Sequence, residues 1–104
     1  MTRKKYKEAQ GHMVGILAVA HAHGLHLRRP WNAGKINAGE IIGLHTRQLD
    51  KLGVPMWVQN QALEYYNNAD DQETWEELLS NGLERIATDI LDEWLDTIEE
   101  EDAA

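Results

Sequence analysis

The stretch of sequence that decides the fold is residues 70–102, DDQETWEELLSNGLERIATDILDEWLDTIEEED. Apolar residues recur in it at steps of three and four, which places them on one side of an α-helix. They are Trp75, Leu78, Leu79, Leu83, Ile86, Ile90, Leu91, Trp94, Leu95 and Ile98. One helix of about 28 residues would form a rod of roughly 42 Å. Asp70 is expected to cap it, and Gly82 to mark a bend or a close helix contact.

Acidic residues cover the side of this predicted helix that faces away from the apolar stripe. The residues expected to bind a partner are Glu73, Glu77, Glu84, Asp89, Asp92, Glu93, Asp96, Glu99 and Glu100. With Glu76 they supply about one carboxylate per 4 Å of helix. One DNA strand carries a charge per about 3.4 Å, so two such helices in a dimer would approach the charge of a duplex. The pattern favours a decoy for a DNA-binding groove, and the alternative is a helix whose charge only keeps the protein soluble.

The rest of the chain predicts three further helices, over residues 4–23, 37–52 and 55–66. Gly24 and Gly53 are expected to end the first two, and Pro55 to begin the third. No stretch alternates like a β-strand. The predicted fold is therefore all-α, a compact bundle of about four helices with a long acidic C-terminal helix, forming a single helical domain over residues 1–104. The expected core is Trp57, Leu63, Leu79, Leu83, Ile86 and Ile90 with Ile16, Leu17, Ile41 and Leu44.

The composition argues against several classes of function. The chain has no cysteine, which excludes disulfides and thiolate metal sites. No apolar run approaches the roughly 18 residues of a membrane span. No phosphate-binding glycine loop or nucleophile motif is present, so we expect no enzyme and no cofactor. His21 and His23 would point about 200° apart on a helix, so we expect no metal site.

Charge divides the chain into two unlike halves. Residues 1–51 carry nine basic and three acidic residues, whereas residues 52–104 carry one basic and fifteen acidic residues. The basic half supports an alternative, a small helix-turn-helix DNA-binding regulator using residues 45–66. Its recognition helix would nevertheless contain no lysine or arginine, and phosphate contacts usually supply much of the affinity for DNA. A third alternative is an acidic helical adaptor that docks on a basic protein.

The turn Val54-Pro55-Met56-Trp57, a short helix, and then an acidic helix running to Asp102 resemble the layout of the Ocr-like phage antirestriction proteins. That family consists of dimeric helical DNA mimics. The resemblance covers about the C-terminal half, because residues 1–51 are basic where the family is acidic throughout. It implies an inhibitor of phage or mobile-element origin that acts in the cytoplasm of an infected cell. The implied target is a host DNA-binding defence or DNA-processing enzyme such as a type I restriction complex, with no direct binding to nucleic acid or membrane. If the protein is a homodimer, we expect Trp94, Leu95 and Ile98 to form the two-fold contact.

Overall fold

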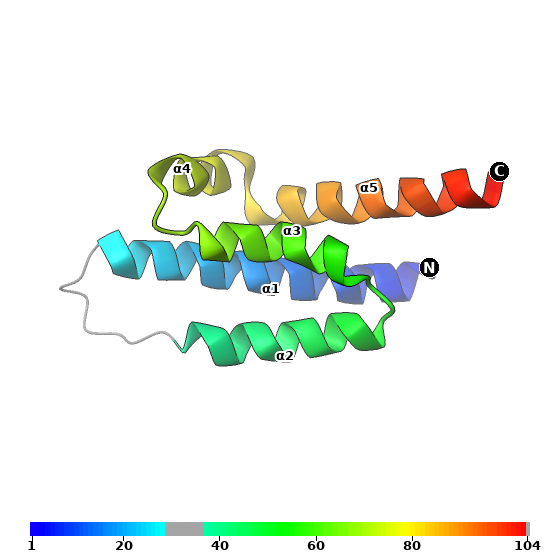
Figure 1. Cartoon of the computed structure of the whole chain (residues 1–104), viewed down its shortest axis with the longest axis horizontal. Helices are drawn as coiled ribbons and strands as arrows, with labels where there is room; N and C mark the ends of the chain where they lie inside the picture. The colour runs from blue at the N-terminus through cyan, green and yellow to red at the C-terminus, as the bar shows by residue number, and fades with distance from the viewer. Residues whose placement is uncertain (29–36, 104) are drawn as a thin grey trace.

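The computed structural model describes residues 1–28 and 37–103, and for Arg28 and residues 99–103 it describes the backbone alone. Every regular element in these residues is an α-helix, as the sequence predicts. The helices are α1 (Arg3–Arg28), α2 (Ala38–Lys51), α3 (Met56–Asn67), α4 (Gln72–Asn81) and α5 (Leu83–Ala103). Helix α1 lies at the centre and contacts each of the other four helices (Figure 1). The two chain ends lie at the same end of the molecule.

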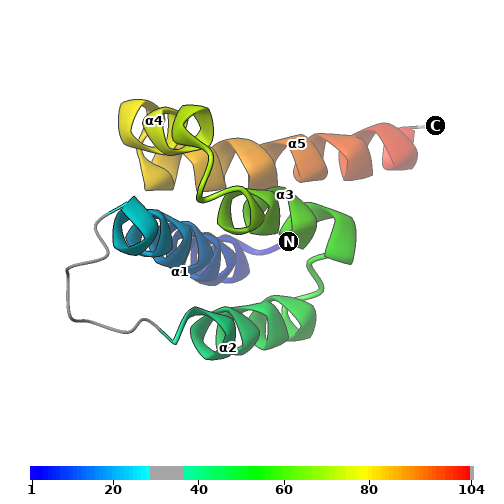
Figure 2. The same cartoon turned by 60° about the vertical axis from the view of Figure 1, so that its left-hand side comes forward.

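The long C-terminal helix predicted from the apolar periodicity is interrupted at Gly82. The chain changes direction at the glycine where a bend or a close helix contact was predicted, but the prediction of one continuous helix is wrong. Gly82 has φ +78° and ψ 143°, a conformation that glycine adopts without a steric penalty. Helix α4 ends before it and turns away from the axis of α5 (Figure 2). The cap of α4 is Asp71, not Asp70, because the Asp71 carboxylate accepts a hydrogen bond from the Glu73 amide at 3.0 Å. The C-terminal third is therefore two helices that point in different directions.

The sequence predicts that the first helix ends at Gly24, and this prediction is wrong. Helix α1 continues to Arg28, and Gly24 is buried inside it. A Cβ at this position would lie 2.9 Å from the Ala69 carbonyl oxygen and 3.1 Å from the Trp75 ring. The absence of a side chain therefore lets the connection between α3 and α4 pack directly on α1.

The turn between α2 and α3 follows the sequence prediction. Gly53 adopts a positive φ of 84°, and Pro55 stands just before the first residue of α3. Behind the turn lies Gln59, which is fully buried. Its side-chain amide donates to Asp50 at 2.7 Å and to the Val54 carbonyl at 3.0 Å. Gln59 thus fixes the connection from inside the protein.

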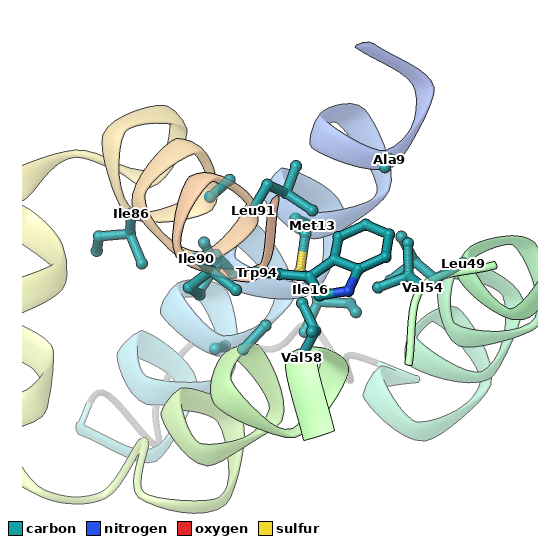
Figure 3. Close-up of a cluster of buried hydrophobic side chains, with 14 of the residues drawn as sticks. Ala9, Met13, Ile16, Leu49, Val54, Val58, Ile86, Ile90, Leu91 and Trp94 are labelled. Carbon is teal, nitrogen blue, oxygen red and sulfur yellow. The ribbon is translucent and has the colours of Figure 1, made fainter. Parts of the chain in front are cut away.

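The main core lies where α1, α3 and α5 meet, with Leu49 and Val54 at its edge (Figure 3). Trp94 is 7% exposed and lies among these side chains, so it is not available for the predicted two-fold contact. Leu95 and Ile98 also pack against this core, partly buried. Four expected core residues are buried, and Leu63 and Leu83 are partly buried. The buried four are Ile16, Leu17, Ile86 and Ile90.

Four other residues predicted to be in the core are exposed instead. They are Ile41 (37%), Leu44 (57%), Trp57 (45%) and Leu79 (53%). Helix α2 packs through Ala38, Ile42 and Leu49, which leaves Ile41 and Leu44 on its outer side. Helix α3 buries Val58, Gln59 and Ala62, and Trp57 therefore faces outward. Leu79 is exposed because α4 turns away at Gly82 and buries only Leu78 among its described residues.

Candidate functional site

The acidic residues predicted to bind a partner occupy two helices. Glu73 and Glu77 are on α4, and the other seven are on α5. All those with described side chains are exposed, namely Glu73, Glu77, Glu84, Asp89, Asp92, Glu93 and Asp96. The side chains of Glu99 and Glu100 lie outside the described residues, although the α5 backbone includes both positions.

The outer face of α5 brings three of these carboxylates together. Asp89, Asp92 and Asp96 follow one another at steps of three and four, so they share one side of the helix. The buried residues of α5, Ile86, Ala87, Ile90, Leu91 and Trp94, occupy the other side. Arg85, four residues before Asp89, is the only basic residue in α5. This face is therefore strongly negative.

A groove between α3, α4 and α5 brings together a second set of acids. Its volume is about 420 Å³, and it is lined by Gln61, Glu64, Tyr65, Asn68, Thr74, Glu77, Ile90 and Glu93. A smaller hollow of about 190 Å³ shares part of this lining and extends to Arg85 and Asp89. Glu77 and Glu93 were predicted site residues, and both line this groove because α4 leaves the axis of α5 at Gly82. Glu64 and Tyr65 were not predicted, since sequence spacing does not relate α3 to the other two helices.

Two tyrosine hydroxyls donate hydrogen bonds to carboxylates of α4 and α5. The Tyr65 hydroxyl donates to Glu77 at 3.3 Å, and the Tyr6 hydroxyl donates to Asp92 at 2.8 Å. Burial raises the pKa of Tyr65 above its ordinary value of 10.0, and the charge of Glu77 raises it further. Burial also raises the pKa of Tyr6, followed by its hydrogen bond to Asp92. Both shifts have the sign expected beside carboxylates, which disfavour a second negative charge.

The basic start of the chain lies at the same end of the molecule as the acidic end of α5 (Figure 1). The basic residues of the first turns of α1 are exposed, and they are Arg3, Lys4, Lys5 and Lys7. The described polar contacts between α1 and α5 are the Tyr6–Asp92 hydrogen bond and one from Gln10 to Thr88 at 2.8 Å. The exposed basic residues of α1 and Asp92 of α5 therefore lie on two helices that are in contact.

The helix-turn-helix alternative would use α3 as its recognition helix. The residues of α3 that are exposed are Met56, Trp57, Asn60, Glu64 and Asn67. Its sequence contains no lysine or arginine. The exposed basic residues nearby, Arg47 and Lys51, belong to α2. The outer face of α3 therefore offers no cation to a DNA phosphate, which is the contact that usually positions such a helix.

Three histidines of α1, His12, His21 and His23, face aromatic or histidine side chains of other helices. His21 stacks on Trp75 with ring centroids 6.3 Å apart, and His23 contacts Tyr66 at 5.0 Å. Across residues 1–28 and 37–103, no group of three or more potential ligands is arranged to hold a metal ion. In the same part of the chain, no helix combines the length and apolar character needed to span a membrane.

Comparison of the chain with protein-family models, curated proteins and solved structures found no match.

Proposed function

We propose that the protein is a non-enzymatic acidic inhibitor, of phage or mobile-element origin, that presents α5 to a DNA-binding protein in place of DNA. The target would be a host defence or DNA-processing enzyme. The observation that carries this proposal is the outer face of α5, where exposed carboxylates follow one another with a single arginine among them. Binding to a groove that holds DNA would be mainly electrostatic and would weaken steeply with salt.

The charge density of α5 supports the proposal. Its sequence holds nine acidic residues in 21. At about 1.5 Å per residue, that is roughly one carboxylate per 3.5 Å. A DNA strand has one phosphate per about 3.4 Å, so α5 by itself resembles one strand in linear charge. A homodimer would present two such helices.

The same charges oppose the stability of the helix that carries them. Acidic residues three and four positions apart repel each other, as do Asp89, Asp92, Glu93 and Asp96 in α5. Glu99, Glu100 and Glu101 are unfavourable near the negative end of the helix dipole. A surface helix that needed only solubility could mix lysine with glutamate at no such cost. We interpret the excess of acids as serving a basic partner.

The test compares a variant with reversed charges on the α5 face with a control variant in which the same number of charges is reversed elsewhere. The double variant is Asp89→Lys and Asp96→Lys, two carboxylates that take part in none of the described hydrogen bonds; Asp89 acts on Tyr6 and Tyr65 through its charge alone. The control pair Glu8→Lys and Glu76→Lys makes the same change in net charge on α1 and α4, away from the α5 face. Immobilised protein is exposed to a bacterial lysate at low salt, and retained proteins are eluted with duplex DNA and identified by mass spectrometry.

The proposal expects DNA-binding proteins in the eluate of the wild type and of the control pair, and their loss from the α5 variant. Retention that survives the α5 reversal would contradict it. Retained proteins that duplex DNA does not displace would instead indicate the acidic adaptor. A gel shift of duplex DNA by the protein alone at moderate salt would indicate the DNA-binding regulator.

A further inference from the structure

Two histidines meet where α2 packs on α1. The Nδ1 atoms of His12 on α1 and His45 on α2 are 2.9 Å apart, and the ring planes are inclined by 56°. At this distance one ring must carry a proton on Nδ1 and donate it, while the other must accept with a lone pair. The hydrogen bond can therefore form when both rings are neutral and when one ring carries an extra proton. It cannot form when both Nδ1 atoms are protonated.

The His45 ring lies directly against Gly15 of α1, with no room for a side chain at that position. A Cβ on Gly15 would lie 2.4 Å from the His45 Nε2 atom and 2.5 Å from its Cε1 atom. The ring thus rests on the α1 backbone with His12 beside it. Burial lowers the pKa of His45 below its ordinary value of 6.5, and the charge of His12 lowers it further.

Few charged groups surround the pair. Glu8 stands four residues before His12 on α1 and is the one acidic residue within four positions of either histidine. The α2 residues one turn from His45 are uncharged: Ile41, Ile42, Gln48 and Leu49. The α3 residues packed near this side of α2 are Leu63 and Tyr66, which bring no carboxylate or ammonium group. Two positive charges at the pair would therefore exceed the single negative charge nearby.

We propose that the His12–His45 contact is an acid-sensitive latch: it holds α2 on α1 with at most one extra proton, and a second proton releases α2. In the doubly protonated state two N–H groups face each other and two positive charges stand on rings whose centroids are 5.2 Å apart. The stabilising contribution of neutral His45 is present above about pH 6.5 and is lost as the pH falls below that value. Release would uncover Val19, Ala38 and Ile42, which form the small second core between these helices.

The experiment measures amide hydrogen-exchange protection of α2 and α5 between about pH 7.5 and pH 5, corrected for intrinsic exchange rates. In the wild type, protection of α2 should fall by about tenfold as the pH decreases while α5 stays protected, because the net contribution of one lost hydrogen bond is of that order. His45→Gln keeps an amide that can donate to His12 and cannot become charged, so α2 should stay protected. His12→Gln should behave in the same way.

His26→Gln is the matched control, since it removes another α1 histidine that is outside this contact. It should reproduce the wild-type profile. Protection of α2 that is unchanged by acid in the wild type would overturn the proposal, as would an equal loss in both glutamine variants. Histidine resonances of the folded wild type provide a measurement that needs no variant. The His45 resonances should titrate below the ordinary pKa of 6.5, and titration at or above that value would contradict the contact.

Discussion

Replacement of Gly82 by alanine is the sharpest test of the break between α4 and α5. At φ +78° and ψ 143°, a residue with a Cβ is strained by about 1–3 kcal/mol. No atom lies within 4 Å of the position that the Cβ would occupy, so the cost comes from the backbone and not from a clash. Gly43 provides the matched control, because it lies inside α2, also has open space, and does not have a positive φ.

We expect Gly82→Ala to lower the free energy of unfolding by about 1–3 kcal/mol. Gly43→Ala should raise it by roughly 0.5–1 kcal/mol, because alanine loses less backbone entropy in a helix. In thermal unfolding followed by circular dichroism, the two melting temperatures should move in opposite directions. For a domain of this size, about 1 kcal/mol corresponds to roughly 4–8 °C. If Gly82→Ala were as stabilising as Gly43→Ala and also increased the helical signal, α4 and α5 would form one continuous helix and the argument would fail.

Three further measurements test the core, the acidic surface and the contact between α1 and α2. Trp94→Ala should lower the free energy of unfolding by about 3–5 kcal/mol because Trp94 is buried in the core, whereas Trp57→Ala should have a much smaller effect in the same urea titration. The Tyr6 hydroxyl should ionise above its ordinary pKa of 10.0 in an ultraviolet titration, and Asp92→Asn should bring its pKa closer to that value. The stability contributed by neutral Tyr6 is present below about pH 10 and is lost as the pH rises through its raised pKa; an unchanged Tyr6 titration in Asp92→Asn would contradict this account. Gly15→Ala should displace the His45 ring and lower the urea midpoint at every pH, and a variant as stable as the wild type would show that His45 does not rest on Gly15.

Glycine shows how far the fold can be predicted from the sequence. The turn at Gly53 and Pro55 was predictable because both residues have local backbone preferences that match a helix end. Gly24 and Gly82 both interrupt apolar helical patterns. Local preference predicts a stop at Gly24, whereas the apolar spacing on both sides of Gly82 predicts a continuous helix with a bend or a close helix contact there. The structure has the reverse. The deciding contacts involve Ala69 and Trp75 at Gly24, and such tertiary contacts are not visible in the spacing of one helix.

Only part of the candidate site could be predicted from the sequence. The exposure of Asp89 and Asp96 could be predicted, because charged residues opposite an apolar stripe remain in water. The groove could not, because it depends on α3 lying against α4 and α5. Nothing in the spacing of α3 relates Glu64 to the other two helices. Glu64 lines the groove with Glu93 because α3 packs on α5, and with Glu77 because α4 leaves the axis of α5 at Gly82.

The central position of α1 has a consequence for how the protein is made. Helix α1 is synthesised before the other four described helices and contacts all of them, and its hydrogen bond from Tyr6 to Asp92 joins residues 86 positions apart. Such long-range contacts form only after the intervening chain is available. On the ribosome, α1 would keep part of its apolar face uncovered until α5 emerges. A nascent chain cut at Gly82 would therefore be an incomplete core with a bare helix, and not a smaller folded domain.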